Sequence, residues 1–293
     1  MQFLRKGYYF LVFTNLLIAL AAAAQCALTY LVFDRPYQPF IILIEGAATL
    51  LLYNSSLLLA KPKNPAASPY LRTRWIFSHT WLMVLNMVIA AILLGYALFQ
   101  VHLYSFLFLG FIGFISFLYS APIIRREGKW GGLRQLPALK VFHIALVWAL
   151  SSVALPAVEL YAQGTPVATD LFVTLFVFKF VFLVICTLPF DIRDMAQDSY
   201  YHLKTIPTVL GERKAILLCY GLLLVHSLLL YFSVVSFPIK VGILATNLLV
   251  AFILRFFVFK KKEHYHYTYL LDLALVLQFV IVLLVLFIFS LLR

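Results

Sequence analysis

The stretch Phe190–Gly211 reads FDIRDMAQDSYYHLKTIPTVLG, and it decides how the rest of the chain is interpreted. It places three carboxylates, Asp191, Asp194 and Asp198, within eight residues, directly after an apolar run long enough to cross a bilayer. The spacings of three and four predict that all three lie on one face of a helix. Acids at a membrane boundary are costly unless water, cations or basic groups receive them. Because Mg²⁺ prefers a few carboxylates together with phosphate oxygens, this segment is a candidate site for Mg²⁺ and a phosphorylated ligand.

The composition around this segment is that of an integral membrane protein. Hydrophobic residues make up 64% of the 293 residues, charged residues only 12%, and the mean hydropathy is +1.00. Soluble domains carry about a quarter charged residues, so a water-soluble fold is excluded. No polar interval is long enough to build a core of its own, and residues 1–293 are therefore predicted to form a single integral membrane domain.

The apolar runs predict an all-α fold, a bundle of nine transmembrane helices. A helix needs about 20 predominantly apolar residues to cross the hydrocarbon layer of a bilayer. The first run is taken as a retained helix rather than a cleaved signal peptide. The nine runs are centred on residues 8–33, 39–60, 76–99, 103–123, 139–162, 169–190, 214–236, 239–259 and 268–292.

The basic residues between the runs predict the orientation of the chain. Lys and Arg precede the first run and fill the second, fourth, sixth and eighth connections, whereas the other connections hold only Arg35 and Lys240. The positive-inside rule then places the N-terminus in the cytoplasm and Arg293 outside, in a cell (inner) membrane. The same alternation accounts for the net charge of +12, so no nucleic-acid partner is inferred.

Read with its neighbours, the acidic segment resembles the second aspartate-rich motif of the UbiA superfamily of intramembrane prenyltransferases. That motif is Asp-x-x-x-Asp followed by a Thr-Leu-Pro-like turn and Leu-Gly. Further upstream, the family often shows Tyr-Ser-x-Pro and then basic residues. The matching positions here are Asp194 and Asp198, then Thr205-Ile206-Pro207 and Leu210-Gly211, with Tyr119-Ser120-Ala121-Pro122, Arg125, Arg126, Arg134 and Lys140 before them. The resemblance spans most of the chain.

The resemblance implies a bundle around a central cavity that opens to the cytoplasmic side, where Mg²⁺ and a prenyl diphosphate are held at helix ends. The implied reaction transfers the prenyl group to a lipophilic acceptor, for instance of aromatic or quinone type. Mg²⁺ would be the cofactor, and the prenyl diphosphate, the acceptor and membrane lipid would be the partners. The implied roles are catalytic for Asp194, Asp198 and Asn54, metal-binding for Asp191, Asp194 and Asp198, and diphosphate-binding for Arg126, Arg134, Lys140 and Lys204.

The first aspartate-rich motif departs from the family pattern. Asn-Asp-x-x-Asp would stand at the end of the second run, but Asn54 is followed here by Ser55 and, three residues further on, by Leu58. A leucine cannot ligate Mg²⁺, and a serine hydroxyl is a weak neutral ligand. Either one carboxylate cluster runs the reaction with basic residues that neutralise the diphosphate, Lys61 being one candidate, or the fold is kept and the reaction is lost.

Three classes of function follow from these observations. The first is prenyl transfer, and the second is a non-catalytic protein of the same fold that binds an isoprenoid or another lipid, or organises partners. The third is a transporter, against which stands the lack of a visible internal repeat. Taken singly, the acids fit a solvated helix face, and the basic residues fit loops anchored at anionic headgroups.

Two opposite charges within the apolar runs are expected to pair. Glu45 and Lys179 lie at comparable depths in the second and sixth runs. A charge inside the bilayer nearly always needs a partner, so a structural pair is predicted if the two helices are neighbours.

Overall fold

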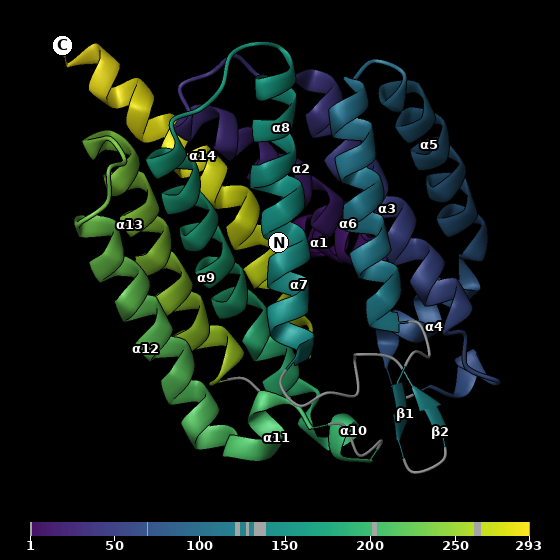
Figure 1. Cartoon of the computed structure of the whole chain (residues 1–293). Coiled ribbons are helices and arrows are strands. Elements are labelled where there is room, and N and C mark those ends of the chain that lie inside the picture. The colour runs from purple at the N-terminus through teal and green to yellow at the C-terminus, as the bar shows by residue number, and fades with distance from the viewer. Residues whose placement is uncertain are drawn as a thin grey trace.

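The computed structural model describes residues 2–68, 70–120, 124–126, 129–131, 139–200, 204–260 and 265–292. These residues form a helical bundle, which confirms the predicted all-α class (Figure 1). One short antiparallel ladder, which pairs Arg126 with Lys129, is an addition that the sequence did not predict. The elements are α1 Gln2–Phe13, α2 Leu16–Val32, α3 Pro39–Leu59, η1 Pro65–Ala67, α4 Leu71–Ser78, α5 Thr80–Leu98, α6 Leu103–Ser120, β1 Ile124–Arg126, β2 Lys129–Gly131, α7 Leu139–Ala149, η3 Leu150–Ala154, α8 Leu155–Ala162, α9 Thr169–Arg193, α10 Met195–Tyr200, α11 Ile206–Leu210, α12 Glu212–Tyr231, α13 Phe237–Ile253, η4 Leu254–Val258, η5 Tyr265–Tyr269 and α14 Leu270–Leu291.

Seven helices of the described part are long and apolar enough to cross a membrane, and the count becomes eight if the bent pair α1–α2 is one span. The α7–η3–α8 segment is one of the seven, because the π-helical turn η3 continues the helix rather than ending it. The α6 segment is apolar but shorter than these seven. The chain is therefore an integral membrane protein, while the number of nine spans stays a prediction.

The first predicted run is broken at Asn15. The axes of Lys6–Phe13 and Leu16–Val32 differ by 78°, and Asn15 between them has φ 60° and ψ 13°. This left-handed backbone conformation is unfavourable for most residues, and Asn is one of the few that adopt it readily. The break points the Asn15 side chain toward α3, where its Nδ2 donates to Oδ1 of Asn54 at 2.8 Å.

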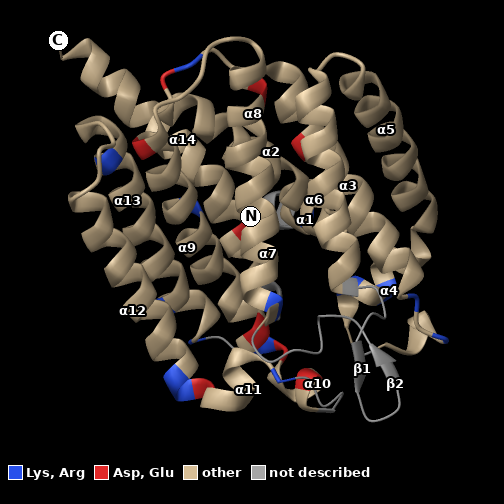
Figure 2. Cartoon of the chain, in the orientation of Figure 1, with Lys and Arg blue, Asp and Glu red and all other residues tan. Residues whose placement is uncertain are grey.

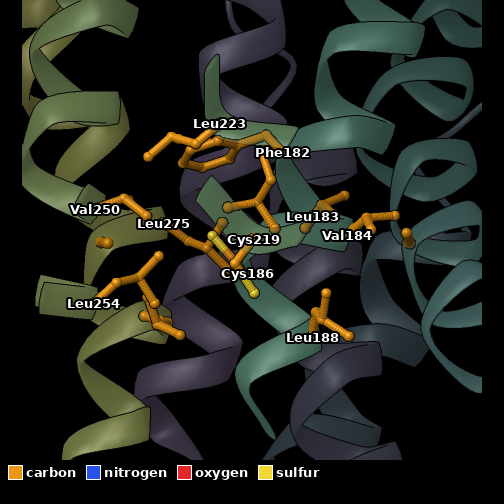
Figure 3. Packing of buried hydrophobic residues seen from close by; sticks show 14 of the residues in the cluster. Phe182, Leu183, Val184, Cys186, Leu188, Cys219, Leu223, Val250, Leu254 and Leu275 are labelled. Carbon is orange, nitrogen blue, oxygen red and sulfur yellow. The ribbon is translucent and has the colours of Figure 1, made fainter. Parts of the chain in front are cut away.

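The helices pack around apolar cores, and one of the two largest joins α7, α9, α12, α13 and α14 to α2. Figure 3 shows part of this core, in which Phe182, Cys186, Cys219 and Leu275 come together from three helices. All three cysteines of the chain are buried and free, as expected of small apolar residues. Large apolar side chains also remain exposed on the outer faces of the helices, as a lipid-facing surface requires.

The polar ends of the elements that form the site meet at one end of the bundle. Figure 1 places α4, α10, α11 and the β1–β2 ladder together at this end, close to the beginning of α7. Figure 2 shows basic and acidic residues gathered there. The bundle therefore brings segments that are far apart in the sequence to the same level.

The expected pair of Glu45 and Lys179 does not form a direct ion pair. Both side chains are buried, but the Lys179 ammonium donates to the carbonyl oxygen of Gln25 and to Oγ1 of Thr29 on α2. No ion pair found among the described residues joins Lys179 to Glu45. The neutral oxygens of α2 thus take the place of the carboxylate as partners of this buried charge.

Candidate functional site

A cavity of about 250 Å³ lies at the polar end of the bundle, and its lining combines charged and apolar side chains. The charged ones are balanced, with three cations facing three acids. The apolar part of the wall comes from α1, α2, α7, α9 and α14 and includes the aromatic rings of Trp148 and Phe190. The charged lining residues are Arg72, Lys140, Arg193, Asp191, Asp194 and Asp272.

Lys140 links two of the predicted metal ligands. It lies in the first turn of α7, and its Nζ is 2.7 Å from Oδ1 of Asp191 and 3.7 Å from Oδ2 of Asp198. Both carboxylates are buried, whereas the exposed fraction of the Lys140 side chain is 32%. The structure thus brings Lys140, Asp191 and Asp198 together, although the lysine is about fifty residues away in the sequence.

Asp194 has a different partner, because the helix is interrupted at this residue. α9 ends at Arg193, Asp194 has φ −91° and ψ 5°, and α10 begins at Met195. The Arg193 guanidinium makes a bidentate contact with its neighbour, with Nε and a terminal nitrogen 2.8 and 2.9 Å from the two Asp194 oxygens. The prediction that all three acids share one face of one helix is therefore wrong. Carboxylates at a helix C-terminus oppose the helix dipole, and here the cations of Lys140 and Arg193 offset that cost.

Asn54 is reached from the cavity through a chain of hydrogen bonds. Arg72, in the first turn of α4, donates to Oδ1 of Asn15 and to the hydroxyl of Tyr269, both at 2.7 Å. Asn15 in turn donates to Asn54, which is completely buried near the end of α3. Asn15, Arg72 and Tyr269 line the cavity together with Tyr53 of α3, whereas Asn54 is not among the described lining residues.

Ser55, Leu58 and Lys61, in and just after the degenerate first motif, are not among the described residues that line the charged cavity. The Ser55 hydroxyl donates to the carbonyl oxygen of Leu51 in its own helix, at 2.5 Å. Leu58 packs against an apolar cluster that includes Val12 and Ile76. Lys61 is exposed, with its Nζ 5.8 Å from the centre of the Phe77 ring. The charge that enters the cavity beside α3 belongs to Arg72 instead.

The described residues that line this cavity include none of the remaining predicted phosphate ligands. Arg126 has its backbone in β1, Arg134 lies outside the described residues, and Lys204 is exposed before α11.

The Thr-Ile-Pro and Leu-Gly features form a compact turn. Thr205 caps α11 in a capping box with Thr208, and Gly211, with φ 80°, separates α11 from α12.

The donor set suits Mg²⁺ on one side of the cavity only. Asp191, Asp194 and Asp198 offer carboxylate oxygens, and Oδ2 of Asp191 is buried without a hydrogen-bond partner in the described part of the chain. Across the described residues, no group of three His, Cys, Asp or Glu side chains converges as a metal site, because Lys140 and Arg193 hold these carboxylates. The α3 side offers a serine and a leucine where carboxylates would be needed. The residues therefore offer metal ligands on one side of the cavity only.

Sequence reasoning missed several lining residues. Arg72 contacts Asn15, which is 57 residues away in the sequence, and Tyr269, which is 197 residues away. No local spacing therefore indicates that these three residues meet. Asp272, by contrast, is recognisable in the sequence as an acid inside an apolar run, and in the structure Arg72 and Arg193 supply positive charges that act on it. Such an intramembrane acid is a functional candidate by itself.

Fold and cavity together define a membrane-embedded helical bundle with a charged pocket at one end. Solved structures show the same fold. A UbiA homolog from Archaeoglobus fulgidus bound to GPP and Mg²⁺ aligns with a TM-score of 0.62 at 16% identity, covering 94% of this chain and 99% of that chain. Its complex with DMAPP and Mg²⁺ gives 0.57 at 15% identity, covering 93% and 98%, and its complex with Cd²⁺ gives 0.55 at 16% identity, covering 94% and 99%.

No model of a protein family matches this sequence, and no curated protein matches it. The chain nevertheless shares the fold of these UbiA homolog structures over nearly its whole length.

Proposed function

We propose that this chain transfers a prenyl group from a prenyl diphosphate to a lipophilic acceptor within the membrane. The observation that carries this proposal is the mixed lining of the cavity, where three cations stand at the polar end of a wall of apolar and aromatic side chains. A prenyl diphosphate has the same division, with an anionic head and an apolar tail. Pockets that bind such ligands are mostly apolar with a few well-placed polar groups.

The reaction is the ionisation of an allylic diphosphate. The bond between the allylic carbon and the oxygen breaks, and the electron pair leaves with the diphosphate. The acceptor then bonds to the carbon and loses a proton. Lys140, Arg72 and Arg193 stabilise the charge of the leaving diphosphate, because preorganised cations act most strongly in a site with little water. The rings of Trp148 and Tyr269 suit the positive charge that develops on the prenyl group.

The proposal includes Mg²⁺ because the charge of a bound diphosphate must be offset. The lining is balanced at three cations and three acids, so a bound diphosphate adds negative charge that must be offset. Bound Mg²⁺ would neutralise the diphosphate and contact its oxygens. Asp191, Asp194 and Asp198 are the residues that would hold it, once Lys140 and Arg193 turn from these carboxylates to the phosphate oxygens.

We also propose that this end of the bundle faces the cytoplasm. The connection around α4, the segment at the beginning of α7 and the region around α11 carry most of the basic residues. Because positive residues are retained on the cytoplasmic side, the cavity would open to the compartment that supplies soluble diphosphates.

The test uses the purified full chain in nanodiscs with Mg²⁺, labelled prenyl diphosphates of increasing length and extracted native lipid. We expect a labelled lipid product and release of diphosphate. Asp194→Asn is expected to lose about 100-fold or more of the rate, since it removes a charge from the metal-binding side. Asp170→Asn is the matched control, because Asp170 lies at the opposite end of the same helix, where its carboxylate accepts from the backbone nitrogen of Leu171.

A second candidate, binding of an isoprenoid lipid without transfer, is favoured by the lack of carboxylates at Ser55 and Leu58. The same experiment separates the two. Saturable binding of a prenyl diphosphate with no labelled product and no diphosphate release, across the whole panel, would support the non-catalytic function and overturn the transferase.

A further inference from the structure

We propose that Arg72 binds a phosphate oxygen of the ligand directly, and that its guanidinium supplies at the end of α3 the positive charge that the UbiA superfamily takes there from Mg²⁺. This inference rests on the proposed function, because it assumes that the cavity receives a diphosphate. It assigns a role to a residue that lies outside both aspartate-rich motifs.

The first support is the way in which Arg72 is held. Its two terminal nitrogens donate to Asn15 and to Tyr269, and its Cζ lies 5.1 Å from the centre of the Tyr269 ring. These contacts fix the plane of the guanidinium against the cavity wall. The Nε atom remains buried, with no hydrogen-bond partner in the described part of the chain. A buried donor left without an acceptor is costly, and an anion in the cavity would satisfy it.

The second support is the orientation that Arg72 imposes on the two asparagines. Arg72 can only donate, so Asn15 must present its oxygen to the arginine and its amide nitrogen to Asn54. The oxygen of Asn54 is then engaged with Asn15, and its buried Nδ2 is left without a partner among the described residues. The polar group that the end of α3 still offers is therefore an N–H donor, which suits an anion and cannot bind a metal ion.

The third support is the loss of every carboxylate on this side. A metal ion beside α3 would need acidic ligands, and Ser55 and Leu58 supply none. An arginine whose planar fork matches phosphate geometry compensates for that loss with a fixed charge. Lys61, the candidate suggested by the sequence, is exposed beside Phe77.

The competing explanation is structural. Asp272 lines the same cavity, and the charge of Arg72 acts on it, so Arg72 could serve only to neutralise this acid. The two explanations differ in what Arg72 does for a ligand. A structural arginine affects the stability of the free protein, whereas a ligand-binding arginine affects the affinity for diphosphate in protein that is folded.

The experiment measures the affinity of the purified chain for geranyl S-thiolodiphosphate, a prenyl diphosphate analogue that is not turned over, at saturating Mg²⁺. Arg72→Gln is expected to raise the Kd by about 10- to 100-fold, the usual worth of a charge-assisted hydrogen bond. Arg74→Gln is the matched control. Arg74 is exposed on the same helix and donates to the carbonyl oxygen of Ser68, so its loss should leave the Kd unchanged.

Asn15→Gly tests Asn15 as a positioning residue. Glycine adopts the left-handed conformation of this position readily, so the break between α1 and α2 is kept while both side-chain hydrogen bonds are removed. We expect a smaller rise in the Kd than for Arg72→Gln. If Arg72→Gln does not fold, Arg72→Lys carries the test with an expected weakening of about threefold to tenfold, because it keeps the charge and loses the fork.

The outcomes distinguish the two proposals. If the wild-type chain binds no diphosphate with Mg²⁺ present, the proposed function fails and this inference fails with it. If the wild type binds and folded Arg72→Gln, or Arg72→Lys in its place, binds equally well, the inference alone is overturned and Arg72 is structural.

Discussion

The Nζ of Lys140 lies 2.7 Å from Oδ1 of Asp191, although the lysine begins α7 and the aspartate stands in the last turn of α9. The same ammonium is 3.7 Å from Asp198 on α10. One partly exposed cation thus joins three helices and lies beside two buried acids.

Lys140→Met is expected to destabilise the chain by about 3 kcal/mol, the lower end of the range for breaking a buried pair, since the lysine is 32% exposed. The cause is the repulsion and desolvation of the two acids that are left behind. Thermal unfolding in detergent measures the effect.

The double variant Lys140→Met with Asp191→Asn should recover much of this loss, because fewer unpaired charges remain. Lys240→Met is the control, since Lys240 lies in the first turn of another helix and donates to the carbonyl oxygen of Tyr231, with no acid partner among the described residues. Equal destabilisation by the single and double variants would contradict the pairing.

Gly211→Ala is expected to destabilise the chain by about 1–2 kcal/mol, because Gly211 has a φ of 80° that L-residues adopt only with strain. No atom lies within 4 Å of the added carbon, so strain alone would account for the loss. Gly221→Ala, in the middle of α12 with equally open space, should be neutral or stabilising. Similar melting temperatures for the two variants would rule out the strained turn.

Gly242→Ala tests the contact between α13 and α14. A carbon added at Gly242 would lie 2.8 Å from Cα of Val282, so the two helices would have to separate. We expect a loss of about 1–3 kcal/mol, as overpacking usually costs. Gly113→Ala on α6 meets nothing within 4 Å and serves as the control. Unchanged stability of Gly242→Ala would mean that the helices are farther apart than the structure has them.

The orientation can be checked with reporters. A reporter fused after Arg293 should be active outside the cytoplasm, and one inserted beside Lys63 should be active inside, because basic connections stay on the cytoplasmic side. A cytoplasmic C-terminus would show that one of the nine predicted spans does not cross the membrane.

The helices could be predicted from the sequence because apolar length alone sets a membrane span. The predicted runs 139–162 and 268–292 differ by at most a residue at either end from the spans Leu139–Ala162 and Tyr267–Leu291. The break at Asn15 could not be predicted, because the apolar run continues on both sides of it. Its left-handed conformation is held by contacts with Asn54 and Arg72, which come from other parts of the chain.

The site was predicted only where its chemistry is local in sequence. Asp191, Asp194 and Asp198 stand within eight residues, so their density is visible without a structure. Their partners were less accessible: Lys140 was predicted to bind phosphate, and only the structure shows that it also contacts two of the acids. Arg72 belongs to a connection with several basic residues, and only the fold shows that this one enters the cavity while Arg74 stays exposed.

The bend after Phe13 has a practical meaning for anyone who purifies this chain. Because α1 does not continue the line of α2, Val12 contributes to the cavity wall, and the Phe13 ring lies 5.4 Å from that of Trp75 on the helix that carries Arg72. The end of α1 therefore forms part of the pocket wall. Affinity tags and fusion partners belong at the C-terminus, because removing α1 would take away part of the cavity wall while leaving every charged lining residue in place.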